Sequence, residues 1–316
     1  MDATKQAIGI DIGGSKTAIG LVTHTGDVIQ YRVFPTEAEQ GFNRAIRRIV
    51  TAVREILRAA DLPPGELAAV GIGCAGPVNP RTGEINNPYT LSGWNHCNIV
   101  EPLERELGVP VCLENDADAA ALGEFYFGAG RGAESMVMLT FGTGIGGAAV
   151  LRGQLYRGVA GEHPEIGHVT VAAEGAACYC GRTGCLESIA SGTALAAAGK
   201  KFGFGSAAEV FAAAASGQPE AARVLQTARA AVDAAIWTLV HTFLPARIVL
   251  GGGMVEAHPG FFLEPARAAI ARATQIPRDY ISVAIAQLGN RAGLAGAARW
   301  AMLRAQPEQK HHSEVP

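Results

Sequence analysis

Three cysteines and a histidine near the middle of the chain could together bind a metal ion. Cys178, Cys180 and Cys185 lie in the segment Cys-Tyr-Cys-Gly-Arg-Thr-Gly-Cys, and His168 lies ten residues before the first of them. Structural zinc takes four Cys or His ligands in a tetrahedron. The glycines between the cysteines allow the chain to fold tightly around an ion. The sequence therefore predicts a zinc-binding loop over residues 168–187.

Closely spaced cysteines can also be buried packing residues, a disulfide or a redox pair. The N-terminus shows no signal-peptide pattern, so we expect a reducing, cytoplasmic compartment, which disfavours a disulfide. Cys74, Cys97 and Cys112 are scattered in apolar or loop contexts and are predicted to be packing residues. Two carboxylates, Glu165 and Glu187, flank the cluster. A metal here would therefore position groups that touch a substrate.

Composition narrows the class of protein. The chain has 316 residues, 48% of them hydrophobic and 17% charged, which predicts a compact globular protein with two lobes. Its apolar runs are too short to cross a bilayer. A net charge of −3 gives no reason to expect nucleic-acid binding. The polar tail, residues 306–316, is expected to be frayed, with His311 and His312 solvated.

Glycines cluster in three loops, each directly after a predicted strand. Backbone N–H groups can cradle phosphate oxygens where no Cβ blocks the approach, which favours a bound nucleotide over three simple turns. The loops contain Gly13 and Gly14; Gly142, Gly144, Gly146 and Gly147; and Gly251, Gly252 and Gly253. Further donors are Lys16, Thr17, Thr140 and Thr143.

Asp11 lies just before the first loop, where it could hold Mg²⁺ through water or accept hydrogen bonds from its own turn. A dinucleotide-binding fold is disfavoured because the loop continues into a strand instead of a helix and no acidic ribose anchor follows. The pattern of a P-loop is absent as well.

The order of predicted elements repeats one theme along the chain. A strand, a glycine turn and a second strand begin at Ile8 and again at Met136, and helices and strands follow each copy. This predicts two related α/β lobes with a cleft between them. We expect a smaller N-terminal lobe over residues 1–117, joined by a C-terminal helix over 293–305, and a larger lobe over 118–292.

Asp116 ends a predicted strand beside Asn115, where a polar pair could face a cleft. Alternatively, Asp116 caps the helix that follows it, although Asp118 could provide that cap instead.

Seven motifs spread over nearly the whole chain resemble the ROK (repressor, open reading frame, kinase) family of sugar kinases, within the sugar-kinase/actin-like ATPase superfamily. The two around the predicted metal ligands, Glu165–His168 and Cys178–Glu187, are the most specific. The others are Asp-Ile-Gly-Gly-Ser-Lys-Thr from Asp11, Gly-Cys-Ala-Gly-Pro from Gly73, the segment Glu114–Glu124, Phe-Gly-Thr-Gly-Ile-Gly-Gly from Phe141, and Leu-Gly-Gly-Gly from Leu250.

The resemblance implies a two-lobed actin-like ATPase (ribonuclease H-like) fold with the active site in the interlobe cleft. It implies transfer of the ATP γ-phosphate to the 6-hydroxyl of a hexose, with Mg²⁺ as cofactor, Zn²⁺ as structural metal and Asp116 as general base. We expect glucose as the substrate. The residues expected to bind the sugar are Asn115, Asp116, Glu165, His168 and Glu187, with Gly76 and Asn95 as further candidates.

His168 would then bind zinc through one ring nitrogen and a sugar hydroxyl through the other. The segment His163-Pro164-Glu165 resembles fructokinase-type members, whereas the cysteine block resembles the glucokinase and N-acetylhexosamine kinase type. The choice among glucose, fructose, N-acetylmannosamine and N-acetylglucosamine therefore stays open, as does a role for His163 as a zinc ligand.

Some family members are sugar-responsive transcriptional repressors with a DNA-binding domain before the first glycine loop. Only ten residues precede Asp11 here, so we expect an enzyme instead. Its expected partners are a hexose, ATP and further copies of the chain as a dimer or tetramer. The alanine-rich stretch over 190–243 could support such an assembly, although no feature fixes the number of subunits.

Overall fold

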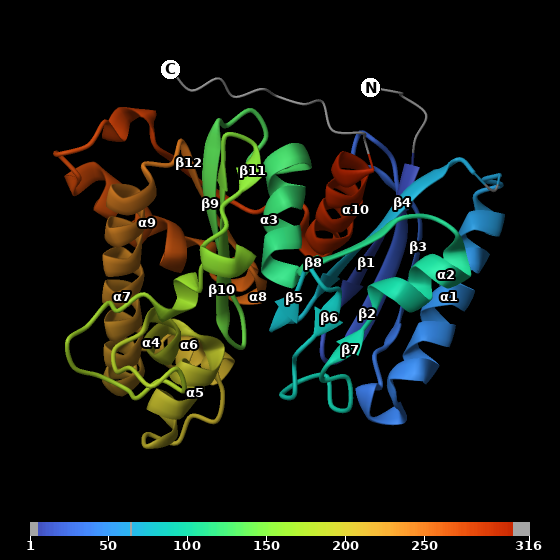
Figure 1. Cartoon of the computed structure of the whole chain (residues 1–316). Helices are drawn as coiled ribbons and strands as arrows, with labels where there is room; N and C mark the ends of the chain where they lie inside the picture. Colours follow the sequence, from blue (N-terminus) through green and yellow to red (C-terminus); the bar gives the residue numbers. More distant parts are fainter. Residues whose placement is uncertain (1–5, 64, 306–316) are drawn as a thin grey trace. The chain divides into compact units, whose positions relative to one another are not determined.

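A computed structural model describes residues 6–63 and 65–305, so the predicted fraying of residues 306–316 lies outside the described part. The chain divides into two compact units (Figure 1). Unit 1 comprises Met1–Gly123 and Asn290–Pro316, and unit 2 comprises Glu124–Gly289. The boundary between Gly123 and Glu124 falls within a helix. It lies a few residues after residue 117, the position at which a lobe boundary was expected. The units are described in turn.

Unit 1 is built on a five-stranded mixed sheet of order β3-β2-β1-β4-β8. Its strands are β1 (Gln6–Ile12), β2 (Lys16–Val22), β3 (Val28–Pro35), β4 (Leu67–Cys74) and β8 (Val111–Asn115). The first three form an antiparallel meander, whereas β1, β4 and β8 run parallel. A small sheet of β5 (Val78–Asn79), β6 (Glu84–Ile85) and β7 (Cys97–Asn98) accompanies it.

Helix α1 (Phe42–Ala59) packs on one face of this sheet through an apolar stripe. Ile46, Ile49 and Val53 of that stripe are buried with Ile8 and Ile10 of β1 in one core. Because side chains alternate along a strand, Gly9 and Asp11 point to the opposite face. A short 3₁₀ turn (Ala38–Gln40) precedes α1, and α2 (Val100–Leu107) packs beside β8.

The opposite face carries α10 (Ala292–Arg304), whose backbone touches the strands directly. A Cβ on Gly9 would lie 2.1 Å from the Leu294 carbonyl oxygen, and one on Gly71 would lie 1.9 Å from that of Ala297. The helix α3 (Asp116–Phe127) crosses α10 just as closely, since a Cβ on Gly296 would lie 1.7 Å from the Ala119 carbonyl oxygen. Glycine is required here for close approach.

Unit 2 repeats this plan with the order β11-β10-β9-β12-β13. The hairpin of β9 (Ser135–Phe141) and β10 (Ile145–Leu151) is antiparallel, with β11 (Gln154–Leu155) at its edge, and β12 (Arg247–Gly251) is parallel to both β9 and β13 (Ser282–Ile285). In each unit a glycine-turned hairpin is followed by two parallel strands. The predicted α/β class with two related lobes is confirmed.

The long helix α7 (Pro219–Phe243) packs against α9 (Pro259–Arg272) over the core of unit 2. The first part of the alanine-rich stretch is divided into short helices, because Ser191 and Ser206 each cap a new helix with their side chains. Its parts are α4 (Leu186–Ala190), α5 (Gly192–Lys200) and α6 (Ala207–Ala215). Helix α9 contains Pro265 in its interior.

Candidate active site and metal centre

Two carboxylates predicted to act in the reaction lie on either side of Cys74 in unit 1. In the parallel register, Cys74 pairs with Ile12 of β1 and with Asn115 of β8. Burial first, and then the charges of Asp116 and Asp11, raise the pKa of the Cys74 thiol well above its usual value, so both carboxylates lie close to it. The carboxyl ends of three parallel strands therefore bring these groups together.

Asp11 is held in a confined place at the end of β1. A Cβ on Gly293 of α10 would lie 2.9 Å from its carboxyl group. Burial raises the pKa of Asp11, and the positive charge of Lys16 partly opposes that rise. A buried carboxylate favours a cation beside it, which is compatible with the predicted role near Mg²⁺.

Asn115 provides the first hydrogen bond of α3. Its Oδ1 accepts from the Ala117 N–H at 2.8 Å and from the Asp118 N–H at 3.4 Å, so Asn115 is the cap that had been considered for Asp118. Asp118 instead lies inside the helix, fully buried. The Asp116 Oδ1 also accepts from Ala117, at 2.9 Å. A Cβ on Gly76 would lie 2.7 Å from Asn115 Nδ2, which explains glycine there.

The first glycine loop is fixed by hydrogen bonds within unit 1. The Gly13 N–H donates to the Lys16 carbonyl at 2.9 Å, and Thr36 Oγ1 donates to the Gly13 carbonyl at 2.7 Å. Thr17 Oγ1 lies 3.0 Å from Thr36 Oγ1, and the Thr17 side chain is buried. The Thr17 hydroxyl thus shapes the loop, whereas Lys16 is exposed, with Nζ 3.5 Å from Asn290 Oδ1.

Asn87 was not identified from the sequence, although it organises the segment that leads to Asn95. Its buried amide donates to the Ala75 carbonyl and to Thr90 Oγ1, and its Oδ1 accepts from the N–H groups of Tyr89 and Thr90. Thr90 in turn lies against Gly14, where an added Cβ would meet it at 2.9 Å. The turn-forming pair Asn87-Pro88 was the available signal. Asn95 itself is exposed.

In unit 2 the second glycine loop is supported by the start of α5. The Gly142 N–H donates to the Gly144 carbonyl, while the N–H groups of Gly192 and Thr193 donate to the carbonyls of Gly142 and Thr143. Thr193 Oγ1 adds a bond to the Thr143 carbonyl at 2.9 Å. The loop carbonyls are therefore satisfied by the helix.

The third glycine loop joins β12 to α8 (Gly253–Ala257). Gly252 has φ +92°, and a Cβ there would lie 2.4 Å from the Phe141 carbonyl oxygen. A Cβ on Gly253, in contrast, would meet nothing within 4 Å. Gly252 is thus needed for packing beside β9, whereas Gly253 leaves open space for a ligand. Gly146 lies in β10, opposite Thr140, and Gly251 ends β12.

The predicted metal ligands come together. One donor atom from each of His168, Cys178, Cys180 and Cys185 lies within 4.8 Å of all the others. His168 Nδ1 lies 3.4 Å from Cys178 Sγ, and the sulfurs of Cys180 and Cys185 lie 3.6 Å apart. Tetrahedral zinc–sulfur bonds place two sulfurs about 3.8 Å apart. The four groups therefore fit zinc.

His163 pairs with Glu165 and is not one of these four donors. Its Nε2 lies 3.4 Å from Glu165 Oε1. The hydrogen bond from His163 lowers the pKa of Glu165, burial opposes this, and the charges of His163 and His168 lower it further. Glu165 is thus kept anionic beside the metal loop.

Glu187 connects the metal loop to the second glycine loop. Its Oε2 accepts from the Ile145 N–H at 2.7 Å, and a Cβ on Gly144 would lie 2.7 Å from the same oxygen. Glu187 follows Cys185 by two residues, in the first turn of α4. Glu187, a candidate sugar ligand, therefore connects the metal ligand Cys185 to the second glycine loop within unit 2.

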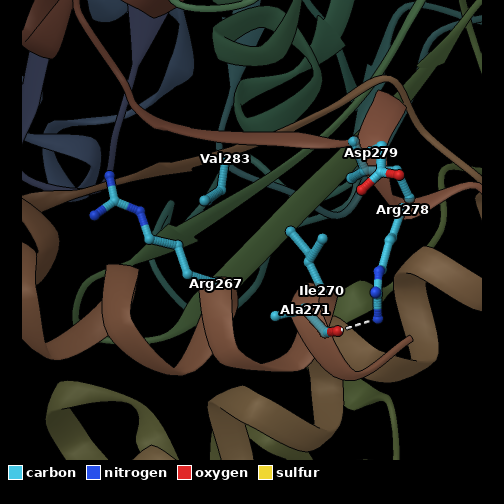
Figure 2. Close-up of a pocket in the computed structure, with 7 residues that line it drawn as sticks. Arg267, Ile270, Ala271, Arg278, Asp279 and Val283 are labelled. Atoms are coloured by element: carbon cyan, nitrogen blue, oxygen red, sulfur yellow. Dashed lines mark hydrogen bonds between the residues drawn. The ribbon is translucent and has the colours of Figure 1, made fainter. Parts of the chain in front are cut away.

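A separate hollow of about 410 Å³ lies beside the end of α9 (Figure 2). Arg278 donates there to the Ala271 carbonyl, which is a contact that caps the helix. The hollow is lined by Arg267, Ile270, Ala271, Arg278, Asp279, Ile281 and Val283. None of the residues predicted to act on a substrate is among them.

Removing one sulfur should abolish metal binding. We expect the purified protein to contain about one zinc per chain, and Cys180→Ser to lose it, because three donors hold zinc far more weakly than four. Elemental analysis by mass spectrometry measures both. Cys97→Ser, outside the cluster, is the matched control and should keep its zinc. Equal metal content in the wild type and Cys180→Ser would contradict the ligand assignment.

Glu165 should lose a proton at a lower pH than an isolated carboxyl group does. Replacing His163 by alanine removes the main cause, so the pKa of Glu165 should rise towards its ordinary value. Carboxyl ¹³C NMR titration measures this, with Glu165→Gln to assign the signal and His24→Ala as a distant control. Because the folded-state pKa is depressed, the pair stabilises the fold above the ordinary pKa and ceases to do so as the pH falls through the depressed value. A titration curve unchanged in His163→Ala would refute the assignment.

The chain resembles known proteins over almost its full length. It is 34% identical to a glucokinase of Halalkalibacterium halodurans, covering 92% of each chain. A ROK hexokinase structure from Thermus thermophilus is 36% identical, with a TM-score of 0.84, covering 95% of this chain and 98% of that one. A ROK family glucokinase structure from Streptomyces griseus, in complex with glucose and AMPPNP, is 32% identical, with a TM-score of 0.72, covering 94% and 99%.

Among the described residues, no helix combines the length and apolar character that a bilayer span requires. The sequence profile of the ROK family matches residues 7–304. The predicted membership is thereby confirmed, together with the actin-like sugar-kinase fold found in the solved relatives. The chain belongs to the ROK family.

Proposed function

We propose that this protein is an ATP-dependent hexose kinase that transfers the γ-phosphoryl group of ATP to the 6-hydroxyl of glucose. The observation that carries the proposal is the strand register, which brings Asp11 of β1 and Asp116, directly after β8, to the same end of the sheet. Relatives of similar length named glucokinase, and the glucose and AMPPNP complex of one of them, support the choice of substrates.

Asp116 is the proposed general base. Its Oδ1 faces the Ala117 N–H, which holds the carboxylate in one orientation at the start of α3. The second carboxylate oxygen of Asp116 would accept the proton of the sugar 6-hydroxyl. As it does so, the hydroxyl oxygen of the sugar attacks the γ-phosphorus, and the bond between that phosphorus and ADP breaks. Asn115, whose Oδ1 is committed to the helix cap, would offer its Nδ2 donors to the sugar.

Residues of unit 2 would recognise the other sugar hydroxyls. Glu165 and Glu187 are acceptors, and His168 would present Nε2 while Nδ1 lies beside Cys178. Zinc, when bound, would fix the tautomer and orientation of His168. Gly76 and Asn95 are proposed as further sugar contacts from unit 1.

The three glycine loops are the proposed nucleotide site. Their backbone N–H groups and Lys16 would neutralise phosphate charge, and the open space at Gly253 would accept the adenosine part. Mg²⁺ would supply the remaining charge neutralisation when bound with ATP, and Asp11 is the residue proposed to lie near it. Thr17 would act indirectly, because its hydroxyl is used within the loop.

A homo-oligomeric enzyme of the cytoplasm is the proposed form of the protein. Half-exposed apolar side chains on α7 and after it, Trp237 and Leu244, are 39% and 53% exposed and support contact with another copy. A domain boundary close to Gly123 is proposed from the division of the chain.

A panel of hexoses tests the function directly. With Mg-ATP, we expect the highest kcat/KM for glucose and lower values for fructose, mannose, N-acetylmannosamine and N-acetylglucosamine. A coupled ADP-release assay measures these values, and NMR of the product identifies the phosphorylated oxygen. A clear preference for another sugar would replace glucose, and absence of turnover with every hexose would refute the kinase.

Replacing Asp116 by alanine should remove turnover while leaving glucose bound. Loss of a general base lowers kcat by about 10²- to 10⁴-fold. Calorimetry should give a glucose affinity within a few-fold of the wild type. Asp27→Ala, in the exposed turn before β3, is the control and should retain full activity. A near-normal kcat for Asp116→Ala would exclude Asp116 as the base.

A further inference from the structure

Tyr179 is a large aromatic side chain on the surface of the metal loop. It lies between the ligands Cys178 and Cys180 and is 83% exposed. Most of the residues before it, from Ala172 to Ala177, are alanine or glycine. Tyr179 is therefore a bulky ring that follows a segment of mostly small side chains.

The loop holds the Tyr179 backbone tightly. The Cys178 N–H donates to the Arg182 carbonyl at 2.7 Å, and the Gly181 N–H donates to the Cys178 carbonyl at 3.0 Å. A metal bound by the two flanking cysteines would restrain it further. A tyrosine on a rigid support offers contact area at a small cost in conformational entropy, since it has only two side-chain torsions.

The ring is oriented towards the residues proposed to bind the sugar. It packs edge-on against the His168 imidazole, with centroids 5.1 Å apart and planes at 86°. One of the three proposed sugar ligands of unit 2 is therefore in direct contact with this side chain.

Exposure alone does not distinguish Tyr179. Tyr89 and Tyr280 are also 83% exposed, yet neither belongs to the metal loop. Tyr280 ends a 3₁₀ turn (Arg278–Tyr280) whose other two residues, Arg278 and Asp279, line the hollow at the end of α9. What sets Tyr179 apart is its packing against His168 and its place between two of the metal-loop cysteines.

We infer that the Tyr179 ring forms a wall of the hexose site and packs against the apolar C–H face of the bound sugar. The inference rests on the proposed function and adds a contact to it. A hexose carries hydroxyls at its rim and C–H groups on its ring faces. Glu165, His168 and Glu187 would bind the rim, while the ring removes a C–H face from water.

The ring contributes to sugar affinity and not to the phosphoryl transfer step. Tyr179→Ala should raise the glucose Kd, measured by calorimetry without ATP, by about tenfold, the effect expected from an aromatic contact. Tyr179→Phe keeps the ring and should stay within about threefold of the wild type. The KM for glucose should follow these Kd values, whereas kcat and the KM for ATP should change less than twofold.

Two measurements separate this contact from a structural role. Zinc content should be unchanged in Tyr179→Ala, and Tyr280→Ala, equally exposed, should bind glucose like the wild type. Unchanged glucose affinity in Tyr179→Ala, or loss of its zinc, would overturn the inference. If the wild type binds and phosphorylates glucose while Tyr179→Ala does so equally well, the contact is refuted and the proposed function stands. A wild type that binds no hexose refutes both.

Discussion

The parallel pairing of β1, β4 and β8 is the constraint on which the candidate site of unit 1 depends. It sets Cys74 opposite Ile12 and Asn115, and so brings Asp11 and Asp116 to the same sheet edge from positions far apart in the sequence. A shift of one residue in either pairing would turn the facing side chains to the other side of the sheet. The relative placement of the two carboxylates would then be lost.

This register is protected by the packing of α10. Its backbone lies directly on Gly9 and Gly71 of the two central strands, and Gly293 lies against the Asp11 carboxyl group. A side chain larger than hydrogen at these positions would push the helix away from the sheet. The same helix that closes the core therefore also confines Asp11.

The sequence predicted much of this arrangement because its strongest signals are local. Four metal ligands within a short segment, and glycines placed directly after strands, need no knowledge of distant contacts. The apolar stripe of α1 was equally readable, since its period follows from helix geometry. The resemblance to the family motifs added the expected actin-like fold and the expected reaction.

What the sequence did not reveal depends on contacts between distant segments. Thr17 seemed available to phosphate, but its hydroxyl meets Thr36, which lies after the following strand. The Asn87 side chain donates hydrogen bonds to the Ala75 carbonyl and to Thr90 Oγ1, and no spacing pattern in the sequence predicts these two bonds. Equally, Asp116 and Asp118 were both plausible caps, and only the geometry at the start of α3 shows that Asn115 has this role.

In the candidate site, structural contacts orient polar side chains through one polar atom and leave a second polar atom of the same side chain for a substrate. Asn115 Oδ1 accepts a hydrogen bond at the start of α3, and Glu187 Oε2 accepts one from the Ile145 N–H. His168 Nδ1 lies beside Cys178 Sγ. Each of these groups has a second polar atom with its own chemistry. Because the first atom is fixed by the backbone or by the metal donors, the second is held in a defined direction before any substrate arrives. Such preorganisation lowers the entropy lost on binding, so the same hydrogen bonds that stabilise the loops would also favour the bound state.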